Sequence, residues 1–230
     1  MIKVIGFDLD DTLWAVRPVI IRAEQKLNHW LKGRAPELRY EMADMAKFRE
    51  RALAQDPDLI KKITELRRQV LLLALEDSAV ANPETIANEA IEVFLTARNE
   101  IEFFDGALDA LQSLAQNYAL GALSNGNADI HRLGLADLFM FAYSAEQVGA
   151  PKPHSALFEK ALEHTQVDPR QMIYVGDDPQ LDVDAANRLG IHTIWLDHGA
   201  KPKGQSEPSA VIKNIKDLPA AVALVQSEAR

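Results

Sequence analysis

The chain has 230 residues, a formal net charge of -9 at pH 7 and 47% hydrophobic residues. This acidity makes nonspecific nucleic-acid binding an unfavourable function, because that function needs Lys and Arg to displace counterions. The absence of cysteine excludes disulfides and thiolate chemistry, and no apolar run is long enough to cross a bilayer, so we expect a cytoplasmic protein without nucleic-acid or membrane partners.

The first predicted element is a short strand, the β-branched apolar run VIGF at 4–7, which leads directly into DLDDT at 8–12. Residues 18–99 then have helical periodicity throughout. In the first of these helices Ile20, Ala23 and Leu27 share one face. The other three helices are predicted at 36–55 with Pro36 in the first turn, at 57–75 with Ile60, Ile63, Leu66 and Val70 on one stripe, and at 82–99 with Asn82 as the N-cap.

After Gly106 the pattern alternates between helices and strands. Alternation with short connections predicts a doubly wound parallel sheet, which makes this an α/β protein. Residues 197–209 read as a loop, and Asp217 is predicted to cap a last helix. The predicted helices are 107–116, 128–139, 155–165, 182–190 and 217–229, and the predicted strands are 118–124, 141–144, 172–176 and 192–196.

The helical span separates the first strand from all the others, and it is too long for a loop in a compact domain. We therefore expect two domains. Residues 1–14 and 103–230 form an α/β core, and residues 15–102 form an inserted helical domain with hinges near 13–17 and 101–106.

Acidic clusters follow two predicted strands, and they raise the question of what offsets their charge. In a parallel sheet, Asp8, Asp10, Asp177, Asp178 and Asp182 would meet at one edge. Carboxylates this close repel one another, so a cation must lie among them. Because the ligand set is all oxygen, Mg²⁺ is the natural ion.

Two other segments add groups that suit a phosphoryl ligand. Ser124 ends a predicted strand, and Lys152 lies between two prolines before a predicted helix. A lysine, a hydroxyl, free backbone N–H groups and Mg²⁺ together favour a site for phosphoryl transfer.

The segments DLDDT, SNGN, PKP and GDDPQLD resemble, in this order, the four motifs of the haloacid dehalogenase-like (HAD) hydrolase superfamily. The resemblance implies a Rossmann-like core with a helical C1-type cap domain. It implies that Asp8 is the nucleophile and Asp10 the acid/base, and that Mg²⁺ is bound by Asp8, by the backbone carbonyl of Asp10 and by Asp177. The phosphate-binding residues that it implies are Ser124, Asn125 and Lys152.

The resemblance leads us to predict a phosphomonoester hydrolase of a small phosphorylated metabolite. Parts of the core also resemble HAD phosphatases associated with FMN and with a phosphorylated ribityl intermediate of riboflavin synthesis. Dehalogenation is disfavoured, because it has no use for Asp10 as a leaving-group acid. A phosphomutase and a phospho-acceptor signalling protein are the alternatives.

Several residues keep more than one interpretation at this stage. Asp178 and Asp182 each either support the metal from behind its ligands or bind it directly, and Asp178 has a further interpretation as the cap of the following helix. Trp14 and Arg17 either line the entrance to the site or, for Trp14, pack in the core. The oligomeric state stays open.

Overall fold

The computed structural model describes residues 1–39 and 44–229. They group into two compact units, one made of Met1–Val16 with Ile101–Arg230 and the other of Arg17–Glu100. None of the helices in the described ranges combines the length and the hydrophobicity that a bilayer crossing requires.

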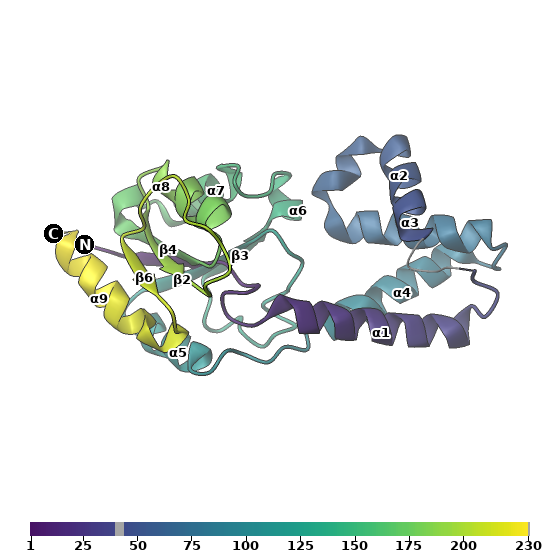
Figure 1. Cartoon of the computed structure of the whole chain (residues 1–230), viewed down its shortest axis with the longest axis horizontal. Helices are drawn as coiled ribbons and strands as arrows, with labels where there is room; N and C mark the ends of the chain where they lie inside the picture. Colours follow the sequence, from purple (N-terminus) through teal and green to yellow (C-terminus); the bar gives the residue numbers. More distant parts are fainter. Residues whose placement is uncertain (40–43, 230) are drawn as a thin grey trace. The chain divides into compact units, whose positions relative to one another are not determined.

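The first unit is built on a six-stranded sheet in the order β3-β2-β1-β4-β5-β6, and every neighbouring pair is parallel. Helices cover both faces (Figure 1). The predicted doubly wound parallel sheet is therefore confirmed. The strands are β1 (Val4–Phe7), β2 (Ala119–Ser124), β3 (Phe141–Ser144), β4 (Met172–Gly176), β5 (His192–Leu196) and β6 (Ala210–Ile212).

The two central strands are buried along their whole length, which explains why they are apolar rather than alternating. Helices α7 (Ala156–Thr165) and α8 (Ala185–Asn187) cover one face of the sheet, whereas α5 (Ala107–Ala115) and α9 (Leu218–Glu228) cover the other. The short helix α6 (Ala145–Val148) follows β3.

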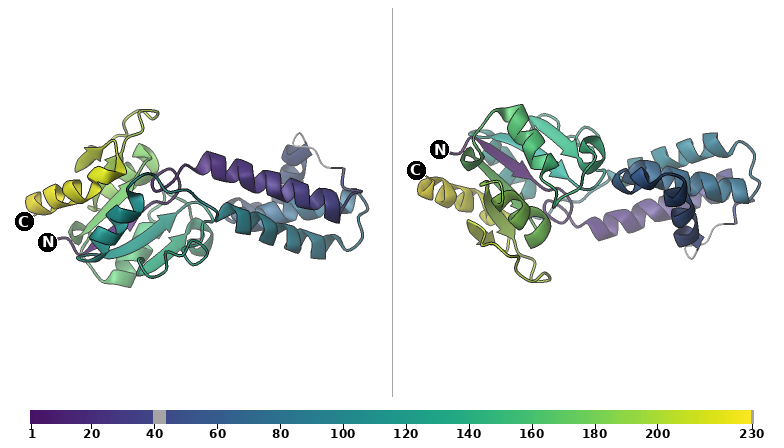
Figure 2. Two further views of the ribbon diagram at one scale, coloured as in Figure 1. Left: turned by 90° about the horizontal axis from the view of Figure 1, so that it is seen from below. Right: turned by 90° about the horizontal axis from the view of Figure 1, so that it is seen from above.

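The second unit is entirely helical among its described residues (Figure 2). Its helices pack on an apolar core that includes Leu27, Leu75 and Phe94, each at most 2% exposed. They are α1 (Val16–Arg34), α2 (Met45–Gln55), the 3₁₀ turn η2 (Pro57–Lys61), α3 (Ile63–Asp77) and α4 (Pro83–Arg98).

The helix predicted over 36–55 is wrong at its start. The chain leaves α1 at Arg34, turns at residues 36–37, and enters α2 only at Met45. Pro36 therefore begins no helix: Ala35 is buried and its carbonyl accepts from the Leu38 N–H, which closes a turn instead. Residues 40–43 of that prediction lie outside the described residues.

The helix predicted over 57–75 is interrupted. Lys62 adopts φ −124° and ψ 78°, which separates η2 from α3. The predicted stripe is consequently split, because Leu66 and Val70 are buried whereas Ile60 and Ile63 are exposed. The break separates Ile60 from the buried face, whereas Ile63 is the exposed first residue of α3.

Three features of the α/β unit also differ from the prediction. Residues 128–139 form successive turns rather than a helix, and 182–190 contain a π-helical turn, η4 (Pro179–Asp184), before the short α8. The edge strand β6 was missed, because three residues are too few to show an alternating pattern.

Asn82 and Asp217 precede their helices as predicted, but neither side chain makes a capping hydrogen bond.

Candidate active site

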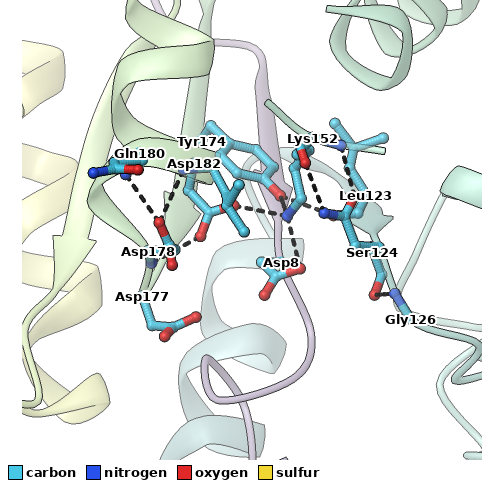
Figure 3. Close-up of polar contacts among 12 residues, drawn as sticks. Asp8, Leu123, Ser124, Gly126, Lys152, Tyr174, Asp177, Asp178, Gln180 and Asp182 are labelled. Atoms are coloured by element: carbon cyan, nitrogen blue, oxygen red, sulfur yellow. Dashed lines mark hydrogen bonds and ion pairs between the residues drawn. The ribbon is translucent and has the colours of Figure 1, made fainter. Parts of the chain in front are cut away.

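The polar segments meet at the carboxyl edge of the sheet. Asp8 follows β1 and Asp177 follows β4, and the register that pairs Phe7 with Val175 makes the two strands end together. The Asp8 N–H donates to the Val175 carbonyl at 2.9 Å, which extends the pairing by one residue. Figure 3 shows the resulting cluster of side chains.

Lys152 is at the centre of this cluster, where it is 4% exposed. Its Nζ donates to Asp8 Oδ1 at 2.8 Å, to Asp182 Oδ1 at 2.7 Å and to the Tyr174 hydroxyl at 2.8 Å. Burial lowers the pKa of Lys152, but the charges of Asp182 and Asp8 outweigh it, so this pKa lies well above its ordinary value. The ammonium therefore stays protonated at any physiological pH.

Asp8 lies in an environment that disfavours its charge. Burial raises the pKa of Asp8 to about 8, and the neighbouring carboxylates of Asp182 and Asp177 add to the rise while Lys152 opposes it. A carboxylate is a nucleophile only when it is ionised. A further positive charge at this site would thus hold Asp8 in its reactive form.

Asp8, Asp177 and Asp182 are placed so that one carboxylate oxygen of each lies within 4.8 Å of the others. Both oxygens of Asp182 accept hydrogen bonds, from Lys152 Nζ and from the Asp178 N–H. Within the described ranges, Asp8 Oδ2 and Asp177 Oδ1 accept none. Asp8 and Asp177 therefore fit a hard divalent cation such as Mg²⁺, which prefers oxygen ligands, better than Asp182 does.

Asp182 approaches this cluster because Gly176 leaves space for it. A Cβ atom at Gly176 would overlap the Asp182 side chain. The π-helical turn η4 then directs Asp182 back toward Lys152. Asp182 is thereby a fixed counter-charge for the lysine.

Asp178 has the role of a helix cap. Its Oδ1 accepts from the N–H groups of Gln180 and Leu181, each at 2.9 Å. Burial raises the pKa of Asp178. A hydrogen bond from Lys201 and these two backbone hydrogen bonds lower it by more, so the pKa of Asp178 lies below its usual value. Of the interpretations that the sequence left open for Asp178, the structure shows the cap.

Asp10 and Trp14 form a pair. Trp14 Nε1 donates to Asp10 Oδ1 at 2.9 Å, and the indole has no exposed surface. Trp14 also packs edge-on against Phe103, with ring centroids 5.9 Å apart. The interpretation that Trp14 lines an entrance is wrong, because its ring is enclosed in the core. Arg17 is exposed and belongs to the helical unit.

The residues after β2 are held by their own hydrogen bonds. The Ser124 hydroxyl accepts from the Gly126 N–H at 2.9 Å. The Asn125 side chain accepts from the Lys152 N–H at 2.7 Å and donates to the Lys152 carbonyl at 2.9 Å. Asn125 thus fixes the backbone that carries the lysine, and its role in phosphate binding stays a prediction, as does that of Ser124.

Sequence reasoning missed two residues of this site, Tyr174 and Lys201. The Tyr174 hydroxyl accepts from Lys152 and donates to the Leu123 carbonyl at 2.8 Å. Its signal was a polar hydroxyl inside the otherwise apolar strand MIYVG, because a buried tyrosine needs a partner. Lys201 lies in a predicted loop and had no comparable signal, yet its Nζ is 2.7 Å from Asp177 Oδ2.

We expect Tyr174→Phe to lower the free energy of unfolding by about 1–2 kcal/mol, because Lys152 loses an acceptor and the Leu123 carbonyl loses its donor. Urea denaturation measures this change. The control is Tyr143→Phe, whose hydroxyl is 2.8 Å from His164 Nδ1 near the surface, with an expected loss below about 0.5 kcal/mol. Equal losses in the two variants would contradict a supporting role for Tyr174.

Comparison with known proteins shows the family to which the chain is similar. A model of haloacid dehalogenase-like hydrolases matches residues 2–190. The chain is 32% identical over 198 residues to the 5-amino-6-(5-phospho-D-ribitylamino)uracil phosphatase YigB of Escherichia coli, an alignment that covers 85% of this chain and 83% of the relative. It is 32% identical over 165 residues to a phosphoserine phosphatase of Thermus thermophilus, with 69% and 66% covered.

Solved structures agree on the fold. One described as a 2-haloacid dehalogenase from Pseudomonas syringae has a TM-score of 0.92 at 40% identity and covers 97% of this chain and 99% of its own. A HAD-hydrolase, YfnB of Bacillus subtilis, has a TM-score of 0.66 at 18% identity, with 96% and 99% covered. At that identity the second likeness concerns the fold alone.

Proposed function

The chain belongs to the haloacid dehalogenase-like hydrolase family, and relatives that align with most of it are named as phosphatases. We therefore propose that it hydrolyses phosphate monoesters of small metabolites through a phosphorylated Asp8, with Mg²⁺ as cofactor. The observation that carries the proposal is the buried contact between Asp8 and Lys152 beside Asp177. A nucleophile, a fixed cation and a pair of free carboxylate oxygens are what phosphoryl transfer requires.

In the first step of this mechanism the Asp8 carboxylate attacks phosphorus through one of its oxygens, and the other oxygen would be left for the metal. The bond from phosphorus to the ester oxygen breaks as the aspartyl phosphate forms. Lys152 stabilises the negative charge that gathers on the phosphoryl oxygens, with Ser124 as a further donor. Asp10 gives its proton to the departing oxygen.

In the second step Asp10 takes a proton from a water molecule, which attacks phosphorus. Inorganic phosphate leaves and Asp8 is regenerated. When bound by Asp8, Asp177 and the Asp10 carbonyl, Mg²⁺ would neutralise the phosphate and keep Asp8 ionised. Trp14 orients the Asp10 carboxylate through its indole N–H.

The substrate is the finer part of the proposal. The relative YigB is named for a phosphorylated ribityl compound, and the resemblance of the core motifs favours the same class or FMN. We assign the helical unit, Arg17–Glu100, as the family's C1-type cap, the part that selects the leaving group.

The test is phosphate release from a panel containing FMN, the ribitylaminouracil phosphate, phosphoserine, sugar phosphates and nucleotides, each with Mg²⁺ and with EDTA. We expect release that needs the metal and that favours the ribityl phosphates by at least about tenfold in kcat/KM. A preference for phosphoserine would overturn the substrate assignment. No release from any compound would overturn the phosphatase mechanism.

A dehalogenase is the second candidate, because a structure 40% identical to this chain is described as one. Release of halide from 2-haloacids without release of phosphate would favour it. Isomerisation of a sugar phosphate would favour a phosphomutase, and labelling of Asp8 without turnover would favour a phospho-acceptor protein.

We expect Asp10→Asn to lower kcat by about 10²–10⁴-fold, because the leaving oxygen loses its proton donor. The asparagine oxygen still accepts from Trp14, so the local fold is kept. Calorimetric titration with MgCl₂ should give an Mg²⁺ Kd within about threefold of that of the unchanged chain, since the proposed ligand is the backbone carbonyl of Asp10 and not its side chain. Unchanged kcat would remove Asp10 from the mechanism.

A further inference from the structure

Lys201 is a second cation at the acidic edge of the sheet. It lies in the loop after β5, and its Nζ is 2.7 Å from Asp177 Oδ2 and 2.8 Å from Asp178 Oδ2. Its own side chain is 41% exposed, whereas that of Asp177 is only 7% exposed. One half-exposed ammonium therefore bridges a carboxylate proposed to bind the metal and a carboxylate that caps η4.

The loop is fixed on the C-terminal side of Lys201. The Asp184 carboxylate accepts from the N–H groups of Gln205 and Ser206 and from the Ser206 hydroxyl, at 2.9, 2.8 and 2.7 Å. Gly204 makes this contact possible, since a Cβ atom there would lie 2.6 Å from Asp184 Oδ2. These bonds tie the loop to η4, the same turn that Asp178 caps.

The loop is also fixed on the N-terminal side. His198 Nε2 is 2.7 Å from the Asp11 carbonyl oxygen, and the Gly199 N–H donates to Asp197 Oδ1 at 2.7 Å. Because anchors flank Lys201 on both sides, its place beside Asp177 follows from the loop and not from a chance surface pairing. A cavity of about 330 Å³, lined in part by Lys201, Asp11 and Asp197, leaves the side chain room to move.

Lys201 differs from Lys152 in what it can do. Lys152 is enclosed by three acceptors, so its position is fixed. Lys201 holds Asp177 from the solvent side, and its bond to Asp178 remains if the bond to Asp177 is lost. A cation arriving at Asp177 thus meets a lysine that is already neutralising it.

We propose that Lys201 is an internal counter-cation that competes with the divalent ion for the negative charge of Asp177 and stays bonded to Asp178 when the ion binds. This inference rests on the proposed metal site. It means that the chain lowers its own affinity for the ion, while Asp177 and Asp178 are never left as adjacent, unneutralised carboxylates.

The test is calorimetric titration of the full chain with MgCl₂, without substrate, for the unchanged chain, Lys201→Met and Lys203→Met. We expect Lys201→Met to lower the Mg²⁺ Kd by about tenfold, because the ion no longer approaches a carboxylate whose charge is already neutralised by an ammonium on its other oxygen. Lys203→Met removes the same charge two residues away, where the lysine is exposed and 3.5 Å from Glu207, and should change Kd by less than about twofold.

An unchanged or higher Kd in Lys201→Met would overturn the inference, and so would an equal fall in both variants, which would reflect net charge alone. These results leave the proposed function standing if the unchanged chain still releases phosphate with Mg²⁺. A chain that binds no divalent ion would overturn the inference and the metal site together. Circular dichroism should show the same fold in all three proteins, because both lysines are at the surface.

Discussion

Replacing Asp8 by asparagine is expected to lower the rate of phosphate release by at least about 10⁴-fold, because the nucleophile of the first step is lost. A carboxamide has nearly the same shape as the carboxylate but does not attack phosphorus. Single-turnover phosphate release at saturating Mg²⁺ measures the loss. Activity within about tenfold of the unchanged chain would remove Asp8 as nucleophile.

The same substitution should leave the fold intact. Burial and two neighbouring carboxylates disfavour the charge of Asp8, so a neutral side chain relieves repulsion, and Lys152 keeps Asp182 and Tyr174 as acceptors. We expect the free energy of unfolding to change by less than about 1 kcal/mol. The matched control is Asp137→Asn, an exposed aspartate of the same unit, which should alter neither activity nor stability.

Replacing Lys152 by methionine is expected to lower the free energy of unfolding by about 3–5 kcal/mol, because Asp8 and Asp182 are left buried without their cation. Methionine keeps most of the volume of the lysine stem, so packing alone does not account for a loss of that size. Phosphate release should fall by at least about 10³-fold as well. Urea denaturation without metal measures the first effect.

Two further variants separate this charge effect from general damage. Lys160→Met removes an exposed lysine that pairs with Glu163, and its expected loss is below about 0.5 kcal/mol. In the double variant K152M/D182N, we expect at least half of the lost stability to return, because one unpaired carboxylate becomes neutral. A loss below about 1 kcal/mol in Lys152→Met, or no recovery in the double variant, would contradict the buried-pair interpretation.

The local sequence pattern was sufficient to predict those strands and helices in which the residue type or the spacing of apolar residues indicates the structure. The buried strands β1 and β4 are short β-branched runs, and the helices α1 and α4 follow apolar spacings that the sequence displays directly. Pattern failed where the signal in the sequence was short or absent. The turn at 36–37 is closed by a local hydrogen bond, the break at Lys62 has no breaker residue, and the edge strand β6 is only three residues long.

The sequence predicted which segments meet at the site, but not which side chains bond to one another there. The order of the four motifs predicted that Asp8, Lys152 and Asp177 belong to one edge of a parallel sheet. It did not reveal that Asp182 pairs with Lys152 while Asp178 caps η4, although the two aspartates are only four residues apart. That choice depends on the π-helical turn and on the space beside Gly176.

Residue type and spacing were enough to predict the α/β class, the helical insertion and a site that combines several acidic residues with a lysine. They did not reveal which carboxylates are buried, which are already paired, or that Tyr174 and Lys201 join them, because these features arise only when the chain folds. The physical reason is that charge becomes costly only on burial, and burial is set by segments far apart in the chain.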